Sequence, residues 1–353
     1  MPQAEVHFRV LGNAGHIQLD RPKTLNALNN DMVLAITAQL KEWQQENAIT
    51  HVVMSSTSPR AFCAGGDIRF ARDVIMAGGY EAADRFFQNE YLCDLAVAEF
   101  GKPVVALCDG LVMGGGAGLA EHASHIVMTE RTRFAMPESS IGLFPDAGAS
   151  LFFGRCPSPV ARLLGMTGHI INVADCLVLG LATTVTTSAQ ISKLESALLS
   201  CEVSMIEDVI EQHRADPGAP SLDPFRQHIE HIFADDLMPE DSRDRAKDLM
   251  RLWPDNQFLQ TIVTAFKDRC PMSIKLFRRL LDVTARFTTP SESLALDFKL
   301  AMRMIRRPDF VEGIRAVIVD KDRAPRWAPS RLEDVDEAML ERVFDDAGLP
   351  PLR

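Results

Sequence analysis

The sequence predicts an α/β fold with mostly parallel strands, followed by a region made of helices. Through the first half of the chain, short apolar runs alternate with amphipathic segments of helical period, which is typical of a parallel sheet with crossover helices. Beyond about residue 188, amphipathic segments follow one another and no strand-like run separates them. We therefore expect two regions, a mixed core in residues 1–187 and a helical region in residues 188–353.

Local patterns predict the elements of the core. Residues 5–19 hold two short strands joined by the turn GNAG. A helix is expected over residues 29–46, where apolar side chains recur at helical spacing, and one of three polar residues caps it: Asn29, Asn30 or Asp31. Residues 68–98 are predicted to be helical. Further strands are expected in THVVMSS, PVVALCDG and SHIVMTE, with a loop at SPRAFCAGGD.

The helical region contains six amphipathic segments. Stretches rich in proline and small polar residues separate them, such as DPGAPSLDP and TTPSES. The six segments are SKLESALLS, IEDVIEQH, RAKDLMRLW, FLQTIVTAFKD, SIKLFRRLLDVTA and SLALDFKLAMRMI.

Composition and charge exclude several classes of protein. Hydrophobic residues make up 46% and charged residues 24% of the chain, as in soluble globular proteins. The net charge of −11 argues against nucleic acid or an anionic membrane as the main partner. The seven cysteines form no CxxC pair, so we expect a reducing compartment and neither a disulfide framework nor a zinc site. No leader or membrane-length apolar run is visible, which predicts a cytoplasmic protein.

Two glycine-rich loops form the first candidate site. MGGGAGLA at residues 113–120 fails the GxGxxG pattern of dinucleotide-binding folds, because Leu119 and Glu121 stand where its last glycine would have to be. No GK[ST] follows, and GxSxG is absent from the chain. With AFCAGGDI at residues 61–68, this loop could present two backbone N–H groups to one oxygen, as in an oxyanion hole. Tight turns with close helix packing are the competing interpretation.

The segment FAMPESSIGLFPDAGAS, residues 134–149, is the second candidate. Glu138 and Asp146 each follow a proline there, among apolar and small residues. Apolar surroundings raise the pKa of a carboxyl group, which suits acid–base chemistry. Capping of helices by the two acids is the alternative.

These pieces, in this order, resemble the crotonase (enoyl-CoA hydratase/isomerase) superfamily. The matching stretches are DRPKTLNAL, AFCAGGDI, KPVVALCDGLVMGGGAGLA and FAMPESSIGLFPDAGAS. The resemblance implies a core of ββα units wound as a spiral, which binds an acyl-CoA. It also implies that the N–H groups of Gly66 and Gly115 hold the thioester oxygen, while Gly114 and Gly118 leave room for the substrate.

Within the superfamily, the chain is most similar to the 3-hydroxyisobutyryl-CoA hydrolases, the thioesterase branch of valine breakdown. MGGGAGL, FAMPE and GLFPD carry this likeness, as do CPMSIKLFRRLL and DFVEGIRAVIVDKDRAPRWAP. Hydratases of the superfamily usually have a catalytic glutamate at the position of Gly118. Without that glutamate, this chain lacks one of the two acids that ordinary hydration needs. The match FFQNEYL implies that Glu90 lies in the acyl pocket, where it could bind a 3-hydroxyl group.

The resemblance also implies roles for the candidate residues. Glu138 would be the main catalytic carboxylate, either as a general base on water or as the nucleophile. Asp146 would orient Glu138 or the water and help to protonate the departing thiolate. Lys23 is the first candidate for the CoA phosphates, ahead of Arg21 and Arg60. No metal or redox cofactor is expected, and family analogy implies a homo-oligomer.

Two departures from this branch keep other interpretations open. Glu121 stands where an apolar or small residue is usual, and Thr184 replaces a common histidine. An enoyl-CoA hydratase or isomerase remains an alternative, in which Glu121 compensates for Gly118. A non-enzymatic acyl-CoA binder is the third hypothesis. The two carboxyl groups argue against it, because binding alone does not need them.

Overall fold

The structure, a computed structural model, describes residues 4–345 and 347–352 and divides into two units. Unit 1 consists of Met1–Asp67, Asn89–Phe134 and Ile171–Ser221. Unit 2 consists of Ile68–Gln88, Ala135–Ile170 and Leu222–Arg353. The units are not divided at the boundary predicted between residues 187 and 188. That boundary between domains remains a prediction.

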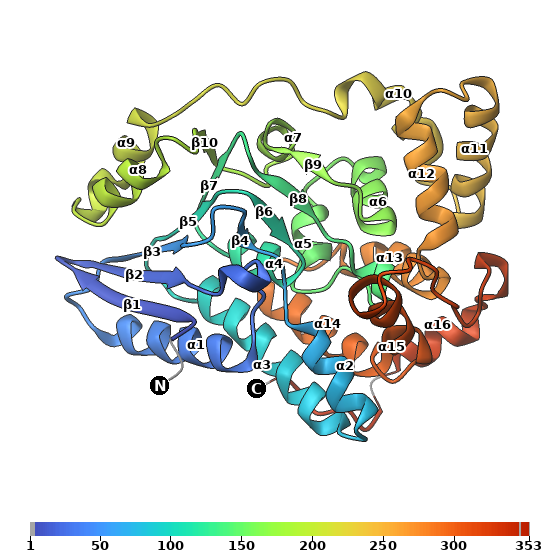
Figure 1. Ribbon diagram of the computed structural model, residues 1–353, viewed down its shortest axis with the longest axis horizontal. Helices are drawn as coiled ribbons and strands as arrows, with labels where there is room; N and C mark the ends of the chain where they lie inside the picture. The colour runs from blue at the N-terminus through green and yellow to red at the C-terminus, as the bar shows by residue number, and fades with distance from the viewer. Residues whose placement is uncertain (1–3, 346, 353) are drawn as a thin grey trace. The chain divides into compact units, whose positions relative to one another are not determined.

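A six-stranded sheet forms the centre of unit 1, and its strand order is β1-β2-β3-β5-β7-β10 (Figure 1). The first two strands are antiparallel, and the other neighbours pair in parallel, which confirms the predicted mostly parallel sheet. The strands are β1 (Val6–Leu11), β2 (Ala14–Leu19), β3 (His51–Ser56), β5 (Val104–Cys108), β7 (His125–Thr129) and β10 (Thr184–Thr186).

A second sheet, of four short strands, was not predicted, and one of its strands lies in the expected loop SPRAFCAGGD. Its strands, in order, are β4 (Ala61–Cys63), β6 (Leu111–Met113), β8 (Arg133–Ala135) and β9 (Ile171–Asn172). The first three directly follow β3, β5 and β7 of the larger sheet. A helix comes after β4 and another after β6, namely α2 (Ile68–Met76) and α4 (Gly115–Glu121). The repeated strand–strand–helix order is the ββα pattern that the resemblance implied.

Helix α1 (Asn30–Gln45) shows how side chains set an element of unit 1. Of the three possible caps, Asn29 is the one used, and its side chain accepts a hydrogen bond from the Met32 N–H at 2.9 Å. Trp43, near the other end, is buried. A Cβ at Gly15 of β2 would lie 2.6 Å from the Trp43 ring, so glycine is what lets the indole approach the strand this closely.

Residues 68–98, which were predicted to be helical, form two helices. Helix α2 ends at Met76, and α3 (Tyr80–Ala98) begins after two glycines. Gly78 has a φ of +85°, a left-handed conformation that ends a helix at little cost only for glycine.

Beyond residue 188 the described part of the chain contains helices and no further strand, as predicted. None of the described helices combines the length and apolar character that a membrane span requires. The six predicted helices are α8 (Ile191–Leu198), α9 (Ile206–Gln212), α11 (Pro239–Leu252), α12 (Gln257–Asp268), α13 (Pro271–Thr284) and α14 (Pro290–Met304). The structure adds α10 (Arg226–Ile232), α15 (Pro308–Ile314) and α16 (Glu337–Phe344).

Candidate active site

The first glycine loop leaves β4 and forms one parallel bridge, between Gly66 and Leu28. The Leu28 N–H donates to the carbonyl of Gly65 at 2.8 Å, and the Asp67 N–H donates to the carbonyl of Leu28 at 2.8 Å. In a parallel pairing, the residue between two such bonds turns its own N–H to the opposite side. The Gly66 N–H therefore points away from Leu28.

The second glycine loop joins β6 to α4. Gly114 is the N-cap of α4, with φ +53° and ψ −133°, a conformation that side chains disfavour. Gly115 is the first residue of the helix, so its N–H belongs to the first turn, where amides have no partner within the helix. A Cβ at Gly116 would lie 2.3 Å from the carbonyl oxygen of Cys63, so α4 packs directly on the backbone of β4.

The two loops meet within unit 1. A Cβ at Gly65 would lie 3.4 Å from the Gly115 nitrogen, and a Cβ at Gly115 would lie 3.3 Å from the Gly66 nitrogen. The two amides thus come from different loops and lie close together. Two such donors can hold one developing oxyanion, the geometry expected from the sequence.

The Glu90 carboxyl group lies against both of these glycines. Glu90 is only 4% exposed, although it belongs to a helix, α3. A Cβ at Gly66 would lie 2.7 Å from its Oε1, and a Cβ at Gly115 would lie 2.0 Å from the same atom. Burial, and more weakly the nearby Glu90 charge, raises the pKa of the Cys63 thiol to about 12. The predicted acyl-pocket glutamate therefore lies beside the predicted oxyanion hole.

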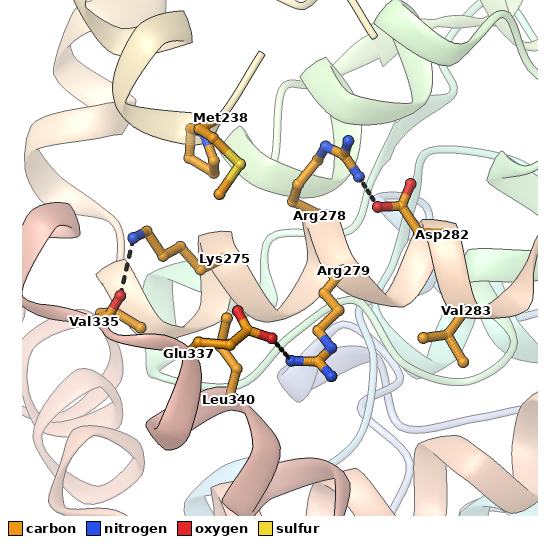
Figure 2. Close-up of a pocket in the computed structure, with 10 residues that line it drawn as sticks. Met238, Lys275, Arg278, Arg279, Asp282, Val283, Val335, Glu337 and Leu340 are labelled. Atoms are coloured by element: carbon orange, nitrogen blue, oxygen red, sulfur yellow. Dashed lines mark hydrogen bonds and ion pairs between the residues drawn. The ribbon is translucent and has the colours of Figure 1, made fainter. Parts of the chain in front are cut away.

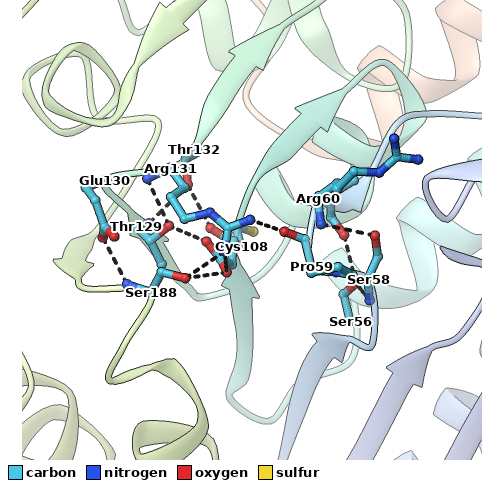
Figure 3. Close-up of polar contacts among 12 residues, drawn as sticks. Ser56, Ser58, Pro59, Arg60, Cys108, Thr129, Glu130, Arg131, Thr132 and Ser188 are labelled. Carbon is cyan, nitrogen blue, oxygen red and sulfur yellow. Dashed lines mark hydrogen bonds and ion pairs between the residues drawn. The ribbon is translucent and has the colours of Figure 1, made fainter.

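A network around Asp109 holds the strands that lead to the two loops. Asp109 accepts hydrogen bonds from Thr129 Oγ1 at 2.6 Å and Ser188 Oγ at 2.8 Å, and forms an ion pair with Arg131 at 3.2 Å. Arg131 also donates to the carbonyl of Pro59 (Figure 3). Because Pro59 precedes β4 and Asp109 precedes β6, the network fixes the entry into both strands. This network was not predictable from the sequence, since its members share no local motif.

Glu138 lies in unit 2, at the start of a 3-10 helix, η2 (Glu138–Ile141), and is 6% exposed. The C-terminal region supports this short helix. The Cys270 N–H at the start of α13 donates to the Ser139 carbonyl at 2.9 Å. A Cβ at Gly313 of α15 would lie 2.5 Å from the Ile141 backbone. Helices α13 and α15 of the C-terminal region therefore pack directly on the segment that carries Glu138.

Asp146, also in unit 2, is 5% exposed and stands three residues before α5 (Ala149–Phe153). The N-cap of α5 is Gly148, so Asp146 does not occupy the N-cap position. The backbone turns sharply after Asp146, because Ala147 and Gly148 both have positive φ, at +53° and +84°.

The cations predicted for the CoA phosphates differ in their surroundings. Arg21 donates to Glu5 at 3.0 Å and to Asp67 at 2.8 Å, which ties it to the scaffold of the first loop. Lys23, in η1 (Pro22–Thr24), and Arg60 are both exposed. Lys23 and Arg60 therefore remain the candidates in reach of a phosphate in solvent.

Glu121 ends α4 and is 5% exposed. It lies six residues after Gly115, which corresponds to a rotation of about 240° around a helix, so the two residues occupy different faces. Burial, helped by the charge of Glu121, raises the pKa of the Cys108 thiol in β5. These surroundings differ from those of Glu90, and they do not favour Glu121 as the replacement for the acid missing at Gly118.

A cavity of about 620 Å³ in unit 2 is lined by residues of α11, α13 and α16 (Figure 2). None of the predicted site residues lines it. Its cations are already paired with acids, in the pairs Lys275–Glu240, Arg278–Asp282 and Arg279–Glu337.

The chain is similar to known proteins along almost its whole length. Residues 14–344 match a family described as enoyl-CoA hydratase/isomerase. The 3-hydroxyisobutyryl-CoA hydrolase, mitochondrial, of Gallus gallus is 35% identical, over 98% of this chain and 90% of that protein. The Homo sapiens protein of the same name is 33% identical, over 99% of this chain and 90% of that protein.

Two solved structures share the fold. A carnitinyl-CoA dehydratase from Mycobacterium thermoresistibile has a TM-score of 0.91 and 27% identity, over 99% of both chains. An enoyl-CoA hydratase from Rhodobacter sphaeroides 2.4.1 has a TM-score of 0.90 and 31% identity, over 99% of this chain and 100% of that one. These likenesses confirm the predicted fold class.

Proposed function

This chain belongs to the enoyl-CoA hydratase/isomerase (crotonase) family, and we propose that it hydrolyses the thioester of 3-hydroxyisobutyryl-CoA or a similar short 3-hydroxyacyl-CoA. The observation that carries the proposal is the meeting of Gly66 and Gly115 with the Glu90 carboxyl group against both. Relatives named 3-hydroxyisobutyryl-CoA hydrolase, alignable over nearly the full chain, support it.

In the proposed mechanism, the thioester oxygen binds the N–H groups of Gly66 and Gly115. Glu138 takes a proton from water as the water attacks the carbonyl carbon, or attacks that carbon itself and is released by water in a second step. In the first route the tetrahedral intermediate expels the CoA thiolate, which takes up the proton that Glu138 removed from water. In the second route the thiolate leaves first, and the water that then cleaves the bond to Glu138 supplies its proton. Asp146 orients Glu138 or the water and helps to protonate the thiolate. The products are the free acid and CoA, and water is the only co-reactant.

Glu90 is the proposed determinant for the 3-hydroxyl group of the substrate. An ionised carboxylate accepts hydrogen bonds and donates none, so it suits a hydroxyl donor. Its position against both oxyanion glycines puts such a hydroxyl within a few bonds of the thioester carbon. This matches an acyl group that carries its hydroxyl at carbon 3.

We also propose valine breakdown in the cytoplasm as the setting, with a homo-oligomer as the assembly. Seven free cysteines, six of them buried, support a reducing compartment. Lys23 is the proposed contact for the CoA phosphates. It is exposed, and it stands two residues after Arg21, which donates a hydrogen bond to Asp67 beside the first glycine loop.

Replacement of Glu138 by Gln tests the role of the main carboxylate. Gln keeps the size of the side chain but is neither a base nor a nucleophile. We expect thiol release from 3-hydroxyisobutyryl-CoA, followed with a thiol reagent, to fall by about 10²- to 10⁴-fold. Glu81→Gln is the matched control, because the Glu81 side chain is 91% exposed, and it should keep the wild-type rate. Full activity of Glu138→Gln would remove Glu138 from the mechanism.

Glu90→Gln tests the substrate assignment. We expect the ratio of kcat/KM for 3-hydroxyisobutyryl-CoA to that for isobutyryl-CoA to fall by about 10-fold, because the hydroxyl then donates to a neutral amide oxygen, a weaker hydrogen bond than one to a carboxylate. Glu99→Gln, at an exposed position just after α3, should leave the ratio unchanged. An equal loss with both substrates would assign Glu90 to the scaffold of the oxyanion hole.

A further inference from the structure

Helix α14 buries a carboxyl group that the proposed mechanism does not use. Asp297 is 0% exposed. Its Oδ2 accepts a hydrogen bond from the Gly148 N–H at 2.8 Å, and its Oδ1 has no hydrogen-bond partner among the described residues. Burying a carboxyl group with so few partners is unfavourable, so its one strong contact is the feature to explain.

That contact holds an unusual turn. Ala147 and Gly148 are two consecutive left-handed residues, and alanine rarely adopts this conformation because its Cβ approaches the backbone. Strained backbone persists only where the surrounding structure holds it. The turn follows Asp146 directly, and the Asp146 carbonyl accepts the N–H of Ala149 at 2.9 Å. The turn therefore sets the path of the backbone that leaves Asp146.

A second contact joins the same two helices one turn earlier on α14. Ser293 lies four residues before Asp297, hence on the same face of the helix. Its Oγ lies 3.2 Å from Ser150 Oγ, and both residues are buried. This pair joins α14 to α5 without touching the turn after Asp146, so it provides a matched comparison.

The charge state of Asp297 agrees with this arrangement. Burial raises the pKa of Asp297; the Gly148 hydrogen bond lowers it by less, and the nearby Asp146 raises it. A neutral Asp297 can accept the Gly148 N–H and avoids the repulsion that two adjacent carboxylates would have. The neutral and isosteric Asn can therefore take its place.

We propose that Asp297 is a positioning residue, which anchors the Ala147–Gly148 turn and so places the Asp146 carboxyl group for thioester hydrolysis. The catalytic part of this inference rests on the proposed function. The anchoring part concerns the turn alone, and it can be measured without substrate.

Three variants test the inference: Asp297→Ala, Asp297→Asn and Ser293→Ala. We expect Asp297→Ala to lower kcat for 3-hydroxyisobutyryl-CoA by about 10- to 100-fold with little change in KM, because Asp146 is misplaced and not removed. Asp297→Asn should restore kcat to within about threefold of wild type, since its amide oxygen accepts the same hydrogen bond. Ser293→Ala removes a buried contact of the same helix pair and should leave kcat unchanged.

Hydrogen exchange of the peptide spanning residues 144–152 gives the readout that needs no activity. Exchange should accelerate in Asp297→Ala and remain slow in the other two variants. If Asp297→Ala does not fold, Asp297→Ser, which is too short to reach Gly148, is judged by the same criteria. Wild-type kcat and slow exchange in Asp297→Ala or Asp297→Ser would overturn the inference, as would equal effects of Ser293→Ala. A wild-type protein that releases no thiol would overturn the proposed function, and the exchange data would still decide whether Asp297 anchors the turn.

Discussion

Individual residues of the glycine loop are required for different physical reasons. Gly114 has a positive φ, which disfavours a side chain, and a side chain at Gly116 would clash with the Cys63 carbonyl. Tight turns and close packing, the competing interpretation from the sequence, account for these two. Gly115 differs, because the group closest to its Cα hydrogens is the Glu90 carboxyl group. The missing side chain of Gly115 leaves room for the Glu90 carboxyl group, a proposed functional group, and not for the backbone of a neighbouring strand.

Gly115→Ala should therefore affect activity more than folding. The new Cβ would lie 2.0 Å from Glu90 Oε1, so the carboxyl group would have to move away from the proposed oxyanion hole. We expect kcat/KM for 3-hydroxyisobutyryl-CoA to fall by at least about 10²-fold, the usual effect of losing one oxyanion donor. The control is Gly218→Ala, at an exposed position where a Cβ meets no atom within 4 Å; its φ of +76° makes the substitution cost stability, but it should leave kcat/KM unchanged. Wild-type kcat/KM in Gly115→Ala would contradict the proposed geometry.

The acids of the site were predictable to different degrees. Glu138 and Asp146 stand among apolar residues in the sequence, and this local pattern is enough to mark them as candidates. Glu90 required the family resemblance, because a glutamate in an amphipathic helix usually faces solvent. Asp297 was not predictable, since its segment SLALDFKLAMRMI looks like any amphipathic helix. Its burial arises from packing against a turn about 150 residues earlier in the chain.

Among the elements, length decided what the sequence could predict. The apolar runs of β3, β5 and β7 have five or six residues and were predicted, but β4, β6 and β8 have three each and were missed. Three residues are too few to show the two-residue alternation of a strand. The second sheet is defined by pairing between distant segments, so local sequence carries little information about it.

The contact between α6 (Ser158–Thr167) and α13 gives a prediction for the elements of unit 2. A Cβ at Gly165 of α6 would lie 1.9 Å from the ring of Phe277 on α13. Gly165→Ala should lower the free energy of unfolding by about 1–3 kcal/mol through overpacking, measured by urea denaturation. Phe277→Leu in the same chain should cancel part of this loss. Simple addition of the two effects would show that the residues do not share this contact.

The stability of the whole molecule should depend on pH through His16 of β2. His16 is 2% exposed, its Nε2 lies 2.8 Å from Ser55 Oγ, and burial, together with the charge of Arg9, lowers its pKa from 6.5 to about 4. Between these pH values the unfolded chain binds a proton that the folded chain does not. The stabilising contribution is therefore complete above pH 6.5 and is lost as the pH falls towards 4.

His16→Gln should remove this dependence. We expect its Tm to change less than that of the wild type between pH 6.5 and pH 4, as measured by calorimetry. Glu195, 3.5 Å from His16, has a pKa raised by burial and acts in the opposite direction, because it gains a proton in the fold as the pH falls. Equal slopes of Tm against pH in the two proteins would show that His16 already carries its proton in the folded state.

Hydrolysis distinguishes the proposed function from the hydration that other members of the family catalyse. The most direct measurement gives one wild-type preparation two substrates and follows thiol release from 3-hydroxyisobutyryl-CoA and loss of the double bond of crotonyl-CoA. We predict rapid thiol release and unchanged crotonyl-CoA, because the chain has Gly118 at the position where the family resemblance implies the second acid of a hydratase. Hydration of crotonyl-CoA without thiol release would contradict the account and turn attention to Glu121.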